Sequence, residues 1–171
     1  GRDAGSIGTQ KTELSHHELM RRGHRGIQRV WDIDAPVIVA CKGWVMGGSF
    51  QRALLCDIRI AAEGTCFRLT ELTYGVIPDT CGVGVLYEMC GPGLVSDLVL
   101  TGRVMHAEEA LRHGGVRRVV AADDLDTVVH EAAGQTGDAP TVSVKPAREG
   151  LRRLPPPPRP SAEHAAGQPP S

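Results

Sequence analysis

The sequence predicts an α/β fold, in which short buried strands alternate with helices. The first observation is an unbroken apolar run at residues 37–41, rich in β-branched side chains and bounded by Pro36 and Gly43, which fits a strand covered on both faces. The second is the pair Gly47-Gly48, followed by a short helical segment at residues 50–55. A strand, a glycine turn and a helix leave free backbone N–H groups at the helix start, which suits a negative charge. A tight turn that needs glycine for its backbone angles is the alternative, which the glycine pair taken alone favours.

Length and composition predict one ordinary domain. The chain has 171 residues and a formal net charge of −1, so charge offers no reason to expect nucleic acid or an anionic membrane as a partner. No apolar run approaches the length of a membrane span, and no secretory signal opens the sequence. Most of the five cysteines lie inside apolar segments, which is typical of small core residues in a reducing compartment (Cys41, Cys56, Cys66 and Cys90). We predict a cytoplasmic protein.

A helix is predicted over residues 16–32. The Ser15-His-His-Glu pattern is a capping box, and apolar residues then recur at helical spacing. His16, His17 and His24 raise the question of a metal site. No carboxylate stands at ligand spacing on the same face, so we interpret them as solvated histidines and predict no bound metal.

The elements after the glycine pair follow from the same periodicities. Apolar patterning predicts strands at 57–62, 66–69 and 116–120 and a loop at 70–81. It also predicts helices at 82–90, 94–100, 107–112 and 123–135. Gly91-Pro92-Gly93 is expected to separate the first two of these helices.

The pattern degrades after Asp138. Residues 142–145 begin like a helix that Pro146 is expected to stop, and from about Pro155 a polar, proline-rich tail is predicted to be disordered. We therefore divide the chain into a partial domain at residues 1–138 and a degraded helix with a disordered tail at 139–171.

Several spaced motifs occur together in this chain: Met46-Gly47-Gly48, Leu54-Leu-Cys-Asp-Ile-Arg59, Phe67-x-x-x-Glu71, Gly75-x-Ile77-Pro78, and Leu100-Thr-Gly-Arg103 followed by Ala107-Glu-Glu-Ala-Leu111. In this order they resemble the crotonase (enoyl-CoA hydratase/isomerase) superfamily over roughly residues 1–120. The resemblance implies a superhelix of ββα turns, here partial because the chain opens at Gly1 where the family already has earlier strands. It also implies an acyl-CoA thioester as partner, coenzyme A being part of the substrate rather than a separate cofactor, and a homotrimer or hexamer for the intact fold.

The resemblance assigns an oxyanion hole. An enolate oxygen needs backbone N–H donors, and the matching positions are the amides of Gly48 and Arg2. A frayed terminus is the competing interpretation of Arg2. The resemblance also implies that Gly47, Trp44 and Pro78 contact the substrate.

The acid/base residues depart from the hydratase pattern. Family hydratases hold water between two glutamates; the second matches Glu71, but the first falls on Gln51, which cannot exchange a proton near neutral pH. Asp79 occupies a position where dienoyl-CoA isomerases carry an acid. A surface carboxylate is the alternative for Glu71, and a turn residue after Pro78 is the alternative for Asp79.

The resemblance therefore predicts an enzyme of the isomerase type, in which Glu71 alone moves the proton and Asp79 assists. A hydratase with Gln51 orienting water is the alternative, and a non-catalytic remnant of the family is a second alternative. Coenzyme A binding separates the remnant from the enzymes.

Overall fold

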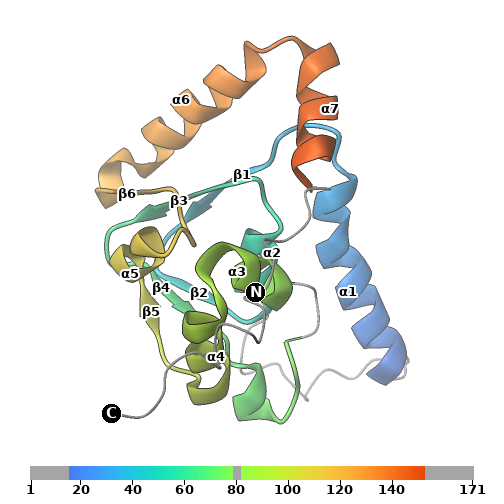
Figure 1. Ribbon diagram of the computed structural model, residues 1–171, viewed down its shortest axis with the longest axis vertical. Helices are drawn as coiled ribbons and strands as arrows, with labels where there is room; N and C mark the ends of the chain where they lie inside the picture. Colours follow the sequence, from blue (N-terminus) through green and yellow to red (C-terminus); the bar gives the residue numbers. More distant parts are fainter. Residues whose placement is uncertain (1–15, 79–81, 153–171) are drawn as a thin grey trace, which may run out of the picture.

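Short strands in two sheets, surrounded by helices, make up the fold in the computed structural model (Figure 1), which describes residues 16–78 and 82–152. The strands are β1 (Ile38–Cys41), β2 (Trp44–Met46), β3 (Ile58–Ala62), β4 (Cys66–Arg68), β5 (Met105–His106) and β6 (Arg118–Val120). The helices are α1 (His16–Asp32), α2 (Gly48–Leu54), α3 (Gly82–Cys90), α4 (Pro92–Thr101), α5 (Ala107–Arg112), α6 (Leu125–Gly137) and α7 (Thr141–Arg152), with short 3₁₀ helices at Glu71–Tyr74 and Ala122–Asp124.

The first four strands alternate between two sheets, β5 joins the sheet of β4, and β6 returns to the other sheet. One sheet has the order β1-β3-β6 and is parallel throughout; the other has the order β2-β4-β5, with β5 antiparallel to β4. The chain changes sheet at Gly43, with φ 61°, and again at Gly64, with φ 74°. Glycine adopts this left-handed conformation at little cost, so the two strand–glycine–strand corners repeat the same path.

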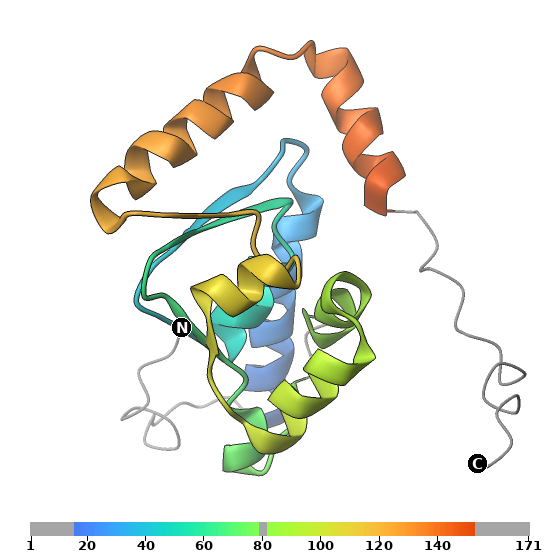
Figure 2. The same cartoon turned by 60° about the vertical axis from the view of Figure 1, so that its left-hand side comes forward.

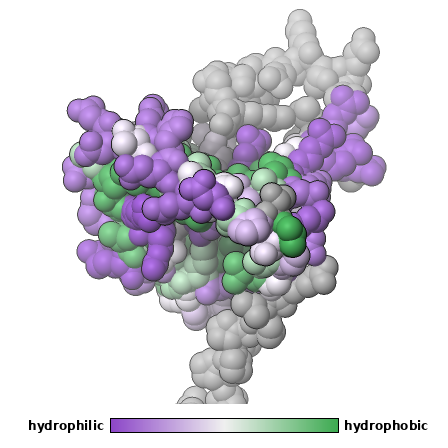
Figure 3. All heavy atoms as spheres, turned by 90° about the horizontal axis from the view of Figure 1, so that it is seen from above, coloured by the Kyte–Doolittle hydropathy of each residue, from purple (hydrophilic) through white to green (hydrophobic). Residues whose placement is uncertain are grey.

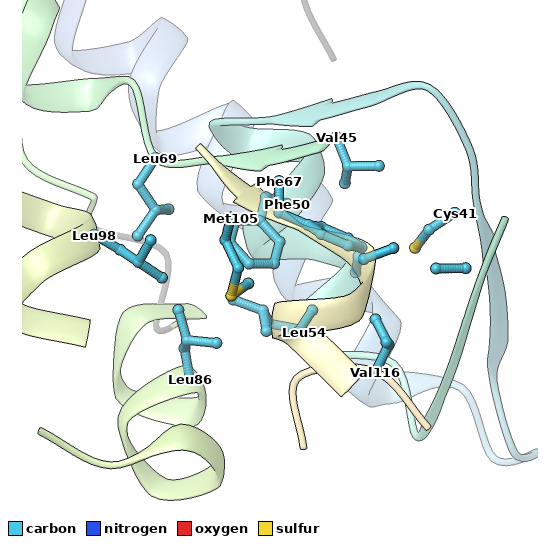
Figure 4. Close-up of a cluster of buried hydrophobic side chains, with 14 of the residues drawn as sticks. Cys41, Val45, Phe50, Leu54, Phe67, Leu69, Leu86, Leu98, Met105 and Val116 are labelled. Atoms are coloured by element: carbon cyan, nitrogen blue, oxygen red, sulfur yellow. The ribbon is translucent and has the colours of Figure 1, made fainter. Parts of the chain in front are cut away.

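The larger core lies between the β2-β4-β5 sheet and the helices α2, α3, α4 and α5. One face of this sheet is formed by Val45, Phe67 and Met105, which are all buried. Figure 4 shows Phe67 beside Phe50 of α2, and their ring centroids are 5.1 Å apart. Burying large aromatic and aliphatic side chains is the main stabilising contribution to a core of this kind.

A smaller core fixes α6 on the other sheet. Leu125 and Ala132 of α6 are buried against Ile60 and Ala62 of β3. Figures 1 and 2 show α6 lying along the β1-β3-β6 sheet, with α7 turning back toward α1. The predicted amphipathic helix is therefore confirmed, two residues later at each end.

Helix α7 is held against the end of α1 by an arginine network. Arg148 is 8% exposed; its Nε donates to Asp57 Oδ2 at 2.7 Å and its Nη2 to the Val30 carbonyl at 3.2 Å. Its Nη1 donates to the carbonyl of Ile33, and Arg152 Nη1 donates to that of Trp31 at 2.8 Å. Since the last carbonyls of a helix lack partners within it, these guanidinium groups cap α1 from another helix.

The structure corrects the prediction that Pro146 stops the helix. α7 runs from Thr141 to Arg152 with Pro146 inside it. A proline costs a helix one N–H donor and creates a clash with the preceding turn. The contacts of Arg148 and Arg152 on the C-terminal side of Pro146 offset this cost. The predicted disorder after Pro155 lies outside the described residues.

Other differences are local. Strands β2 and β5, each three residues or fewer, and the 3₁₀ helix at Glu71–Tyr74 were not predicted. The predicted break between α3 and α4 is present at Gly91, but α4 begins at Pro92, two residues earlier than predicted, because proline is well suited to the first helical turn. β1 is not covered on both faces: Cys41 is buried, but Ala40 is exposed.

The described surface is mostly polar. Figure 3 shows hydrophilic residues over most of the face seen from above, with smaller hydrophobic areas among them. In the described residues, no helix is long and apolar enough to cross a membrane.

Candidate functional site

The site is built where the turn after β2 meets the segment after β4. Because β2 and β4 are paired in parallel, with Met46 opposite Arg68, the residues that follow both strands emerge at the same sheet edge. Gly47 and Gly48 follow β2, and Thr70 and Glu71 follow β4. The Gly47 amide donates to the Arg68 carbonyl at 3.0 Å, which joins the two segments.

Gly47 makes this close approach possible. Its φ of 50° and ψ of −126° lie where only glycine is comfortable. A Cβ at this position would lie 3.3 Å from Thr70 Oγ1 and 3.4 Å from Glu71 Oε1. A larger residue would therefore push against the side chains of Thr70 and Glu71.

Gln51 and Glu71 are in direct contact. Gln51 is 2% exposed on α2, and its Nε2 donates to Glu71 Oε1 at 2.7 Å. The other carboxylate oxygen, Glu71 Oε2, is buried and has no hydrogen-bond partner in the part of the chain that the structure describes. A buried carboxylate oxygen without a donor is uncommon and is available to accept a proton or a hydrogen bond from a bound molecule.

Gly82 at the start of α3 closes the other side of Gln51. A Cβ there would lie 2.8 Å from both Cα and Cβ of Gln51, which is too close for any side chain. Gln51 is thus enclosed by α3 on one side and faces Glu71 on the other. Neither Gly82 nor Thr70 was predicted as a site residue; the glycine at a helix start, next to the predicted loop, was the only available signal for Gly82.

Arg59 fixes the far end of α2. Its Nη1 donates to the Cys56 carbonyl at 2.5 Å and to the Leu54 carbonyl at 3.4 Å, and its Nε donates to the Gly115 carbonyl at 2.8 Å. Burial lowers the pKa of Arg59 from its usual value, an effect that neighbouring groups partly oppose. The helix that carries Gly48 and Gln51 is therefore held at its C-terminus by a half-buried cation.

The Gly48 amide is the first N–H of α2, and among the described residues it has no hydrogen-bond acceptor. An Ala at this position would place its Cβ 3.7 Å from Ile27 Cδ1 of α1, which is an ordinary van der Waals contact. Ile27 therefore lies next to Gly48 on the α1 side. The Gly48 N–H is a candidate donor to an oxygen of a bound molecule.

The remaining predicted site residues are less closely tied to Glu71. Trp44 is 59% exposed on β2, on the sheet face opposite the core, and Pro78 is half-buried beyond the 3₁₀ helix. Arg2 and Asp79 lie outside the described residues, so their roles stay predictions. A hollow of about 660 Å³ lies between α1 and α2 and is lined by Arg29, Val30 and Arg52, among others, but not by Glu71. We place the site at Glu71 because the glycine turn, the Gln51 side-chain amide and a Glu71 oxygen without a partner among the described residues meet there.

Comparison with known proteins identifies the family of this chain. The family model for enoyl-CoA hydratase/isomerase matches residues 1–161. A carnitinyl-CoA dehydratase of Salmonella paratyphi B is 38% identical over 130 residues, which are 76% of this chain and 50% of that protein. The chain thus spans about half the length of the curated relatives it matches.

Solved structures share the fold. A Thermobifida fusca YX protein in complex with acetoacetyl-CoA superimposes with a TM-score of 0.79 at 28% identity, over 88% of this chain and 63% of that one. A monofunctional enoyl CoA isomerase from M. smegmatis gives a TM-score of 0.71 at 30% identity, over 78% and 63%. The predicted crotonase-like fold is therefore confirmed over the part shared with these structures, and the chain belongs to the enoyl-CoA hydratase/isomerase family.

Proposed function

We propose that this protein moves the double bond of an enoyl-CoA thioester, with Glu71 as the acid/base. The observation that carries the proposal is the contact between Glu71 and Gln51. One carboxylate oxygen of Glu71 accepts a hydrogen bond from the buried Gln51 side-chain amide, and the other oxygen has no hydrogen-bond partner among the described residues. The acetoacetyl-CoA bound in the T. fusca relative supports an acyl-CoA as the ligand.

Double-bond migration needs only one proton-transfer group. A base removes a proton from C2 of a 3-enoyl thioester, the negative charge spreads over C2, C4 and the thioester oxygen, and the same group returns the proton at C4. A carboxylate held by the Gln51 amide through one oxygen can present its other oxygen to both carbons. The thioester oxygen gains charge in this step, and the Gly48 N–H is the donor that we assign to it.

The Gly48 assignment is tested by removing only the N–H. Gly48→Pro should lower turnover by about 10²–10³-fold, because one oxyanion donor is lost. Proline is suited to the first turn of a helix, so the helix itself is expected to form, with some added cost in folding. Gly48→Ala is the matched control: it keeps the N–H and adds only the ordinary contact with Ile27, so it should retain activity. Full activity in a folded Gly48→Pro protein would contradict the assignment.

Hydration, with Gln51 orienting the water, is the alternative function. It is favoured by the similarity to a carnitinyl-CoA dehydratase, whose name describes the loss of water from an acyl-CoA. Adding water requires one group to deprotonate the water and a proton donor for C2, which in the family pattern are two carboxylates. An amide side chain cannot exchange that proton.

Gln51→Glu distinguishes the two functions. The substitution changes an amide to a carboxyl group at nearly constant volume and places it beside Glu71, where like charges favour one ionised and one protonated carboxyl. We expect the variant to add water to a 2-enoyl-CoA, whereas the parent protein isomerises a 3-enoyl-CoA. The loss of the absorbance of the conjugated enoyl thioester measures the addition of water. A parent that hydrates as fast as the variant would favour the hydratase. Coenzyme A binding without either reaction would favour the non-catalytic alternative.

A further inference from the structure

A cysteine and a histidine lie side by side on the outer face of the β2-β4-β5 sheet, away from Glu71. Cys66 begins β4 and His106 ends β5, and the antiparallel register places them directly opposite each other. The Cys66 Sγ lies 3.6 Å from His106 Nδ1. Directly opposed residues on one sheet face have neighbouring side chains, so the contact follows from the pairing of the strands.

The sheet presents this pair to solvent. Val45, Phe67 and Met105 alternate with the outer-face residues and fill the core, which leaves Trp44, Cys66 and His106 on the other face. His106 and Trp44 are exposed, and Cys66 is partly exposed, so the prediction that Cys66 is a small core residue is wrong. A small molecule in solution can therefore approach the Cys66 sulfur.

The other described cysteines are in a different environment. Burial raises the pKa of the Cys41 thiol to about 11, and it also raises the pKa of the Cys56 and Cys90 thiols above their usual value. Desolvation disfavours the thiolate, which is the reactive form. Cys41 is 2% exposed and Cys56 is 8% exposed, so access to them is restricted as well.

We propose that Cys66 and His106 form a reactive thiol–imidazole pair that exchanges with small disulfides to give a mixed disulfide at Cys66. His106 Nδ1 accepts the thiol proton, and the thiolate attacks one sulfur of the disulfide. A new S–S bond forms at Cys66 as the original S–S bond breaks, and the departing thiolate takes the proton back from the imidazolium. The small disulfide is the oxidant, and one thiol is released for each Cys66 modified.

Oxidised glutathione is the probe for the first test. The native protein is incubated with it, the reaction is quenched with acid at intervals, and peptide mass spectrometry follows each cysteine separately, including Cys81, which lies outside the described residues. We expect Cys66 to react at least about tenfold faster than Cys90, because Cys66 lies beside a proton acceptor at 3.6 Å on the solvent-facing side of the sheet, whereas burial disfavours the thiolate of Cys90. Equal rates at Cys66 and Cys90 in the native protein would overturn the proposal.

The second test removes the base. His106→Asn leaves a polar side chain that can form hydrogen bonds on the exposed face, but an asparagine side chain cannot take up a proton. We expect the Cys66 rate to fall about tenfold, with the Cys90 rate unchanged. An unchanged Cys66 rate in a variant with a native thermal melt would refute the role of His106. Should the variant melt early, the ratio of Cys66 to Cys90 rates in the parent protein decides the proposal by itself.

Discussion

Replacing Glu71 by Gln should lower turnover by about 10²–10⁴-fold while leaving acyl-CoA binding nearly unchanged. The expected loss corresponds to removal of a positioned general base. The side chain keeps its shape. The oxygen of the new glutamine can still accept the hydrogen bond that Gln51 Nε2 donates to Glu71 Oε1 at 2.7 Å. Only the capacity to take up a proton disappears. Deuterium incorporation from heavy water into the C2 and C4 positions of a bound acyl-CoA, followed by NMR, measures this step directly.

Glu88→Gln is the control for this experiment. Glu88 is an exposed carboxylate on α3, so the same chemical change there should leave exchange and turnover as in the parent protein. Undiminished deuterium exchange in Glu71→Gln would rule out Glu71 as the base. Exchange absent from the parent protein, with coenzyme A still bound, would instead indicate a family member that binds without catalysis.

Replacing Arg148 by Ala should release α7 from α1 and lower the stability of this docking by about 3 kcal/mol. That magnitude is typical of a buried ion pair that loses one partner. The Arg148 side chain is 9% exposed and that of Asp57 is 22% exposed, so both charges are largely withdrawn from water. The variant leaves the carbonyls of Val30 and Ile33 without this donor. Hydrogen exchange of the amides in residues 141–152 reports the release directly.

Lys145→Ala is the matched control on the same helix. The ion pair of Lys145 with Asp34 joins side chains that are 50% and 76% exposed, and such surface pairs contribute little to stability. Its loss should leave the exchange of α7 amides near the parent values. Equal protection of α7 in both variants would show that the Arg148 network does not hold the helix in place.

Much of the fold was predictable because its signals are local. The helical period over residues 16–32 predicted α1 with the bounds that the structure has, and the apolar runs predicted β1, β3 and β4 to within one residue at each end. Strand β5 was missed because two residues carry no periodicity, and its formation depends on pairing with β4. A short strand is defined by its partner more than by its own residues.

The sequence by itself determined the chemical identity of the site: a glutamine at position 51, a glutamate at position 71 and a glycine pair before α2. Through these motifs it also determined the family. Only the tertiary structure decided that the Gln51 amide donates to one oxygen of Glu71 and that Gly82 packs on Gln51. It also decided that α7 continues past Pro146, where the contacts of Arg148 stabilise it. The reason is physical: local propensity depends on neighbours along the chain, whereas these contacts join residues 20 to 118 positions apart. Their free energy exists only once the sheets and helices have brought those residues together.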